Sequence, residues 1–101
     1  MSDSTTARYA ALHESARDTM PGGNTRTTVW RAPHPIYAAS GKGCRIMDVN
    51  GNTYLDFINN FTSMIHGHAN PVIAEAVREQ LEFGTCFAMP TESEIGLAEL
   101  L

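Results

Sequence analysis

Arg26 is the residue whose type and setting best suit the binding of a ligand. It follows Asn24 and Thr25 in a polar loop, just after a Pro-Gly-Gly sequence, and it does not belong to a periodic helix face. A guanidinium held on a loop can capture a carboxylate through two parallel hydrogen bonds. Composition alone favours the alternative, an ordinary exposed arginine. The residues by themselves therefore assign Arg26 no role.

His66 and His68 flank Gly67 and could chelate a metal ion, with Cys86 as a further ligand. Zinc sites need a third and a fourth ligand at a recognisable spacing, and the sequence offers none. We favour a structural interpretation, in which Gly67 permits a tight turn and one histidine forms a hydrogen bond near the following helix. A metal-binding module stays as the third alternative for the chain's function.

Lys42 is the only lysine of the chain and lies between two glycines. The segment 41–43 is too short for a phosphate-binding loop, because it lacks both the third glycine of GxGxxG and the Lys-Ser/Thr of a Walker motif. We expect a turn with an exposed lysine that is no nucleophile. The carboxylates of Glu75, Glu79 and Glu82 are expected to form a solvated helix face. No catalytic residue is assigned in this chain.

Residues 44–71 organise the chain, and at their centre Asn50-Gly51 predicts a β-hairpin. This dipeptide favours a two-residue type I′ turn, since both central positions need a positive φ. The expected cross-strand pairs are Val49–Asn52, Met47–Tyr54, Ile46–Leu55 and Arg45–Asp56, the last of opposite charge. With a strand over residues 36–39 and a turn over residues 41–43, a three-stranded antiparallel sheet is predicted.

Helices are expected before and after this sheet in the sequence. Apolar residues at helical spacing predict an amphipathic helix over residues 5–20, which Pro21-Gly22-Gly23 ends. Asn70-Pro71 begins a second helix that ends near Gly84, and a capping box of Thr91 and Glu94 begins a third. Residues 24–35 suit an extended loop with short strand character, and residues 57–67 a buried loop or one helical turn. The fold class is therefore α+β.

Composition excludes several functional classes. The 101 residues suit one domain, and a net charge of -4 argues against a nucleic-acid binder. Two cysteines indicate reduced thiols, and neither a signal peptide nor a membrane-spanning apolar run is seen, so a cytoplasmic protein without membrane partners is expected. The third helix lacks a stop signal at its end. We therefore expect the chain to be part of a longer protein.

Four segments, PGGNTR, GCRIMDVNGNTYLDF, SMIHGHANP and GTCFAMPTESE, together resemble the N-terminal part of class III pyridoxal-phosphate (PLP) aminotransferases. The nearest subgroup contains glutamate-1-semialdehyde aminomutase and the β-amino-acid aminotransferases. The resemblance implies that residues 1–101 form the N-terminal segment of an α/β fold type I homodimer, with a small-domain helix and sheet leading into the large domain. It also implies PLP as the cofactor.

The same resemblance implies roles for individual residues. Arg26 would hold the substrate carboxylate, Phe61 would form a wall of the site, and Thr25 and Thr62 would be neighbours of the same pocket. The Schiff-base lysine, the acidic partner of the pyridine nitrogen and the phosphate cup lie downstream in the family. This chain alone is therefore expected to be inactive, and no cofactor-binding residue is assigned in it.

The implied reaction is transfer of an amino group between an amino acid, possibly a β-amino acid, and a 2-oxo acid. The aminomutases usually read PGGVNSPVRAF, with the arginine farther along and a tryptophan in place of Phe61, and these differences favour an aminotransferase. The intramolecular aminomutase is the alternative within the family. The alternative from another class is a small non-catalytic α+β binding module without a cofactor.

Overall fold

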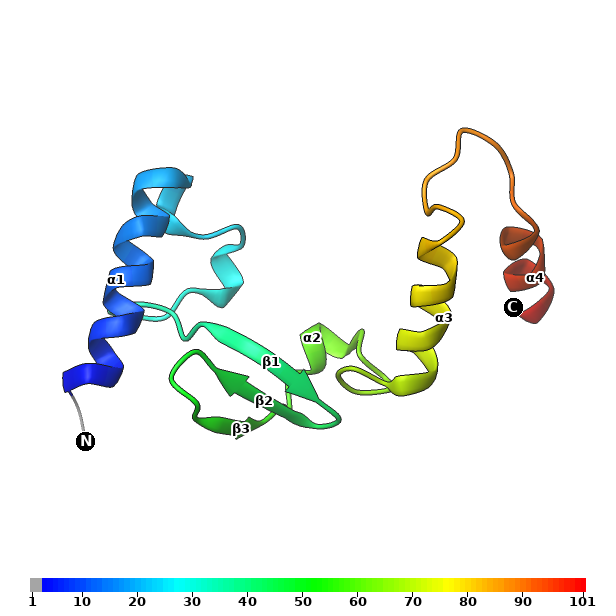
Figure 1. Ribbon diagram of the computed structural model, residues 1–101. Helices are drawn as coiled ribbons and strands as arrows, with labels where there is room; N and C mark the ends of the chain where they lie inside the picture. The colour runs from blue at the N-terminus through cyan, green and yellow to red at the C-terminus, as the bar shows by residue number, and fades with distance from the viewer. Residues whose placement is uncertain (1–2) are drawn as a thin grey trace. The chain divides into compact units, whose positions relative to one another are not determined.

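Figure 1 shows a computed structural model of the chain that describes residues 3–101, with side chains described from residue 6 onward. The elements are α1 (Asp3–Thr19), η1 (Pro21–Gly23), η2 (Thr27–Val29), β1 (Ala38–Lys42), β2 (Arg45–Asp48), β3 (Thr53–Leu55), α2 (Asn59–Thr62), α3 (Pro71–Leu81) and α4 (Glu92–Leu100). The strands form one antiparallel sheet in the order β1-β2-β3. This confirms the predicted α+β class. One compact unit ends at Asn70, and a second unit comprises Pro71–Leu101.

Helix α1 confirms the predicted amphipathic helix and supplies the buried apolar side chains of the first unit. Tyr9 and Ala16 are each 8% exposed. The ring centroids of Tyr9 and His34 lie 5.6 Å apart, and those of His13 and Trp30 lie 5.0 Å apart. The loop that follows η2 therefore packs against α1 through aromatic contacts.

The segments before the hairpin differ from the prediction in two places. Strand β1 runs to Lys42, so the chain reverses at Gly43-Cys44 and not over residues 41–43. Gly43 has a φ of 55°, a conformation that glycine adopts without steric cost. Residues 24–35 form a loop as expected, but its regular part is the 3-10 turn η2 and not a strand.

The hairpin around Asn50-Gly51 is confirmed, but its predicted register is wrong by one residue. The cross-strand pairs are Arg45–Leu55, Ile46–Tyr54 and Met47–Thr53. The loop therefore has three residues, and the N–H of Gly51 donates to the carbonyl of Asp48 at 3.0 Å. Gly51 has a φ of 85°, as expected where a type I turn is followed by a left-handed residue. The predicted pairing of Arg45 with Asp56 is lost with this shift.

The carboxylate of Asp48 explains the longer loop. One oxygen, Oδ1, accepts the backbone N–H groups of Asn50 and Asn52, both at 2.9 Å. The other, Oδ2, accepts the side chains of Tyr9, Asn52 and Tyr54. Asp48 is fully buried, and a buried carboxylate is tolerated only when its oxygens accept hydrogen bonds in this way. This cluster ties α1 to the hairpin.

The same hydrogen bonds set the ionisation of the cluster. Burial acts to raise the pKa of Asp48, but the bonds from Tyr9, Asn52 and Tyr54 outweigh it and hold that pKa well below its ordinary value. In return, the hydrogen bond to Asp48, followed by burial, raises the pKa of Tyr54 to about 12. At neutral pH the carboxylate of Asp48 is therefore an anion and the hydroxyl group of Tyr54 is neutral.

An isolated β-bridge between Gly43 and His68 brings the chain back to the sheet after α2. The N–H of Gly43 donates to the carbonyl of His68 at 2.8 Å, and the N–H of His68 donates back at 2.9 Å. Gly67 makes the approach possible: its φ is 74°, and a Cβ there would lie 2.9 Å from the carbonyl oxygen of Gly43. Glycine is required at position 67 for both reasons.

The second unit confirms the predicted helices. Helix α3 begins at Pro71, and α4 follows Thr91, whose N–H donates to the Glu94 carboxylate at 3.1 Å as one half of the expected capping box. The apolar stripe of α3 is largely uncovered by the described residues, with exposed fractions of 47% for Ile73, 51% for Val77 and 61% for Leu81. The three glutamates predicted to lie on a solvated face are exposed. No described helix has the length and apolar content needed to cross a bilayer.

The Asp48 cluster predicts a loss of stability in acid. Because the pKa of Asp48 is lower in the folded chain than its unfolded value of about 3.9, its contribution is complete above that value and is lost as the pH falls below it. We expect Asp48→Asn to unfold at a lower urea concentration than the wild type at pH 7, and the difference to shrink on going to pH 3. A difference that does not depend on pH would contradict the assignment.

The Gly43–His68 bridge predicts unequal effects of two alanine substitutions at positive φ. Gly51→Ala meets no atom within 4 Å and should cost only the left-handed conformation, about 1 to 2 kcal/mol of unfolding free energy. Gly67→Ala should cost more, by about 1 kcal/mol or above, because its Cβ also clashes with the backbone of Gly43. Denaturant unfolding of the two variants measures the difference, and equal losses would refute the role given to the bridge.

Candidate functional site

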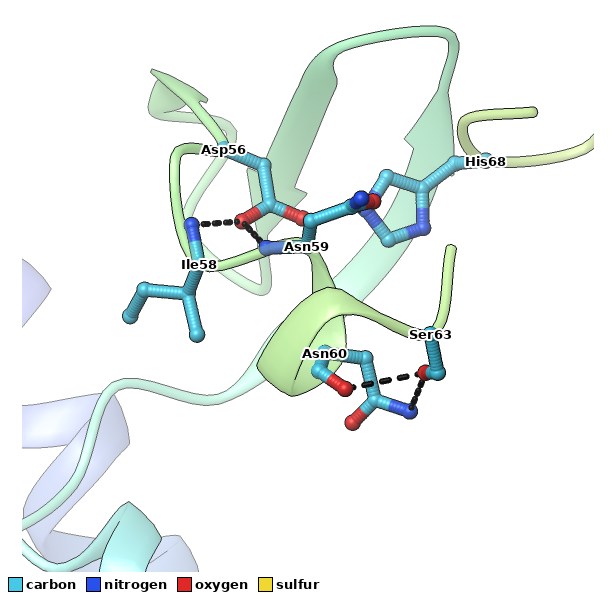
Figure 2. Close-up of polar contacts among 6 residues, drawn as sticks. All are labelled: Asp56, Ile58, Asn59, Asn60, Ser63 and His68. Atoms are coloured by element: carbon cyan, nitrogen blue, oxygen red, sulfur yellow. Dashed lines mark hydrogen bonds and ion pairs between the residues drawn. The ribbon is translucent and has the colours of Figure 1, made fainter. Parts of the chain in front are cut away.

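Asp56 lies directly after β3 and joins three segments of the first unit. Its Oδ1 accepts the backbone N–H groups of Ile58 at 2.9 Å and Asn59 at 2.8 Å, as Figure 2 shows. Its Oδ2 lies 2.7 Å from Nε2 of His68. The side chain of Asp56 is 7% exposed and that of His68 is 22% exposed. A largely buried carboxylate with partners on both oxygens is a rigid anchor for the loop that follows.

The hydrogen bonds also keep Asp56 ionised. The backbone N–H of Asn59, then the His68 side chain and the N–H of Ile58, hold the pKa of Asp56 below its ordinary value against the opposing effect of burial. The carboxylate is therefore an acceptor at any pH near neutrality. It is suited to orienting its partners and not to supplying a proton.

His68 is fixed from two sides. Its backbone forms the bridge to Gly43, and its ring lies against Gly41, where an added Cβ would come within 2.6 Å of the His68 Cγ. The contact of His68 with Asp56 agrees with the structural interpretation, in which one histidine of the pair forms a hydrogen bond. Among the described residues, no group of three or more His, Cys, Asp or Glu side chains gathers in a way that could hold a metal ion.

The segment α2 that follows Asp56 is a left-handed turn. Asn59, Asn60, Phe61 and Thr62 have φ values of 53°, 46°, 56° and 72°. A left-handed conformation costs a residue about 1 to 2 kcal/mol relative to the right-handed form. Among the residue types of this turn, only asparagine adopts it at a lower cost. A single turn was one of the two forms predicted here, but Phe61 and Thr62 are exposed, so the alternative of a buried loop is wrong for these residues.

Local hydrogen bonds support this turn at its far end. Asn60 donates from its side-chain amide to Oγ of Ser63 at 3.0 Å, and the Ser63 hydroxyl donates to the carbonyl of Asn60 at 2.9 Å (Figure 2). At the near end the turn is held by Asp56. Polar contacts thus hold both ends of the turn, and its left-handed conformation contains no glycine.

The turn meets Arg26, the residue singled out from the sequence. An Nη atom of Arg26 donates to Oδ1 of Asn60 at 3.4 Å, and Cζ lies 6.0 Å from the centroid of the Phe61 ring. The structure therefore brings Arg26 to this turn, in which Asn60 lies 34 residues later in the sequence. Thr25 precedes Arg26 and Thr62 follows Phe61; both are exposed, and neither side chain forms a hydrogen bond with the described residues.

The guanidinium of Arg26 is available for a ligand. It is exposed, and no carboxylate of the described residues forms an ion pair with it. Its contact with Asn60 is long and occupies one of five N–H groups, so that a bidentate carboxylate could still bind. The neighbouring aromatic face adds a cation–π contact at the limit of its range.

The described residues do not fit the cofactor that the resemblance implies. PLP is held through a lysine amine and a phosphate cup, and Lys42 is an exposed residue of β1. The residues of this site can bind and orient a carboxylate, but they offer no group to attach PLP. We therefore assign no cofactor-binding residue in this chain.

No role beside Arg26 was predicted for Asp56, Asn60 or His68. Asp56 was assigned to a cross-strand pair with Arg45, and His68 was one of two equivalent histidines. The available signal was the glycines at positions 41 and 67: a Cβ at position 41 would meet the His68 ring, and a Cβ at position 67 would meet the backbone of Gly43. For Asn60 the signal was the Asn-Asn dipeptide, since asparagine tolerates positive φ.

Comparison with known proteins agrees with the motifs. Residues 27–101 match the family described as Aminotransferase class-III. Over 90 residues the chain is 41% identical to glutamate-1-semialdehyde 2,1-aminomutase from Methanothermobacter thermautotrophicus, an alignment that covers 89% of this chain and 21% of that protein. The chain thus spans about a fifth of that relative's length.

Two solved structures are similar to the chain. One is an omega-transaminase from Sphaerobacter thermophilus, 61% identical with a TM-score of 0.88, where the match covers 91% of this chain and 21% of that one. The other is a β-phenylalanine aminotransferase from Variovorax paradoxus, 33% identical with a TM-score of 0.87, covering 93% and 22%. Together with the match over residues 27–101, these likenesses show that the chain belongs to the class III aminotransferase family.

Proposed function

We propose that the protein carrying this chain is a PLP-dependent aminotransferase that moves an amino group between an amino acid and a 2-oxo acid. Residues 1–101 would be its N-terminal segment and would form part of the substrate side of the active site. The observation that carries the proposal is the guanidinium of Arg26, exposed and without a carboxylate partner among the described residues, beside Asn60 and Phe61.

The proposed division of labour follows from what this chain contains. PLP would supply the electron-sink chemistry and would be held by residues in the four-fifths of the relatives' length that this chain does not cover. Arg26 would bind the substrate carboxylate, and the ring of Phe61 would form a wall beside it. Thr25 and Thr62, the sequence neighbours of these two residues, would line the same pocket. We further propose a cytoplasmic homodimer as the working form.

A β-amino acid is the donor that we favour. One relative is named a β-phenylalanine aminotransferase, and the chain is 61% identical to a transaminase against 41% to the aminomutase. In a β-amino acid the carboxylate is one carbon farther from the amino group than in an α-amino acid. Arg26 lies on a loop before η2, so its side chain can adjust to this longer distance between the amino group and the carboxylate.

The proposed role of Arg26 is tested by two donors that differ only in the carboxylate group, β-phenylalanine and 1-phenylethylamine. We expect Arg26→Ala to lower kcat/KM for β-phenylalanine about 30-fold or more, the effect of losing charge-assisted hydrogen bonds. The same variant should change kcat/KM for 1-phenylethylamine less than about threefold. The measurement is made in the complete PLP-loaded enzyme.

Arg31→Ala is the matched control, since Arg31 is an exposed arginine of the same loop. It should leave both donors unchanged. If Arg26→Ala lowers turnover of the two donors equally, Arg26 does not bind the carboxylate and the proposal fails.

The aminomutase is the second candidate, because a protein of that name is 41% identical over 90 residues. An aminotransferase needs an acceptor, so steady turnover of β-phenylalanine should stop when the 2-oxo acid is left out and return when it is added. A mutase isomerises one substrate and continues without an acceptor. Product formation from glutamate-1-semialdehyde alone would decide for the mutase.

A further inference from the structure

We infer that Asp56 and His68 are positioning residues for substrate recognition, because they set the left-handed turn that presents Asn60 and Phe61 to Arg26. This inference rests on the proposed function, since it assumes that Arg26 binds the substrate carboxylate. It concerns neither the cofactor nor the reacting atoms.

The first step is the placement of His68. Two backbone hydrogen bonds to Gly43 fix its main chain, and the absence of a Cβ at Gly41 leaves room for its ring. The ring therefore has little freedom, and its Nε2 is directed at Asp56 at 2.7 Å. His68 is therefore a rigid hydrogen-bond partner for Asp56, held beside the turn that connects β1 and β2.

The second step is the placement of the turn. Oδ2 of Asp56 is engaged by His68, which leaves Oδ1 to accept the N–H groups of Ile58 and Asn59. Asn59 is the first of the four consecutive left-handed residues, so the bond to Asp56 lies where the chain changes handedness. Without it, these residues are expected to favour other conformations, because the left-handed one is costly for phenylalanine and threonine.

The third step is the placement of Arg26. The described contacts of its guanidinium are with Asn60 and Phe61, and both belong to the turn. A rearranged turn would therefore remove both contacts together. Without these contacts the long side chain of Arg26 is flexible in the free enzyme. Binding a carboxylate then costs the conformational entropy of ordering this side chain, and the affinity is lower.

The alternative is that Asp56 and His68 only hold the fold together. In that case their loss would lower the amount of active enzyme, or turnover of every donor, without regard to the carboxylate. The two roles are separated by KM for donors with and without a carboxylate.

The test compares His68→Ala, His68→Gln and Asn60→Ala with the wild type in the complete PLP-loaded enzyme. We expect His68→Ala to raise KM for β-phenylalanine about tenfold and to change KM for 1-phenylethylamine less than twofold. His68→Gln, whose amide nitrogen can replace Nε2, should restore most of the difference. The neighbouring His66→Ala is the matched control and should behave as the wild type.

Asn60→Ala is a second variant that tests whether the turn positions Arg26. Asn60 is exposed, so its substitution opens no cavity and costs only the left-handed conformation at that residue, and it should raise KM for β-phenylalanine selectively as His68→Ala does. Calorimetric binding of 3-phenylpropionate, a carboxylate without an amino group, provides a readout that needs no turnover. Its dissociation constant should rise about tenfold in both variants.

The outcomes separate this inference from the function on which it rests. If Arg26→Ala itself fails to discriminate between the two donors, the proposed function fails. If Arg26→Ala discriminates but His68→Ala and Asn60→Ala affect both donors equally, the proposed function stands and the positioning role is overturned. The same conclusion follows if His68→Ala cannot be purified folded and Asn60→Ala leaves KM for β-phenylalanine unchanged.

Discussion

The carboxylate of Asp56 is the interaction on which the candidate site depends. It accepts hydrogen bonds from a histidine twelve residues later and from the two N–H groups that open the left-handed turn. The side chain is almost completely shielded from water, so each of these bonds is made in surroundings where an unpaired carboxylate would be unfavourable. The loop after β3 is therefore held by a charged group and not by apolar packing.

Asp48 is the last residue of β2 and Asp56 directly follows β3, and the hydrogen bonds that each carboxylate accepts fix a different part of the first unit. Asp48 is surrounded by neutral donors and connects α1 to the hairpin through Tyr9. Asp56 is paired with a histidine and connects the sheet to the turn beside Arg26. Stability of the first unit and geometry of the proposed binding wall thus depend on two separate carboxylates.

The sequence was sufficient for the three longer helices and the hairpin, and insufficient for the contacts between the elements. Helical periodicity and capping residues predicted α1, α3 and α4, and Asn50-Gly51 predicted the hairpin. The register was wrong because the turn dipeptide was read without the side chain of Asp48, which lengthens the loop by accepting N–H groups from it. The pairing of Arg26 with the turn could not follow from spacing, since it joins segments that approach one another only after the sheet and the Gly43–His68 bridge have formed.

The handedness of α2 limits which amino acids can serve there, whatever the ligand. Asparagine and glycine enter that backbone readily, whereas valine, isoleucine and threonine enter it at high cost. Thr62, with a φ of 72°, is already an exception to this preference. In a screen of variants of this loop, many substitutions will therefore be lost because the residue cannot adopt the left-handed backbone, and not because a ligand contact has changed. Changes of ligand contacts are better sought at Arg26, where the backbone is extended and accepts any side chain.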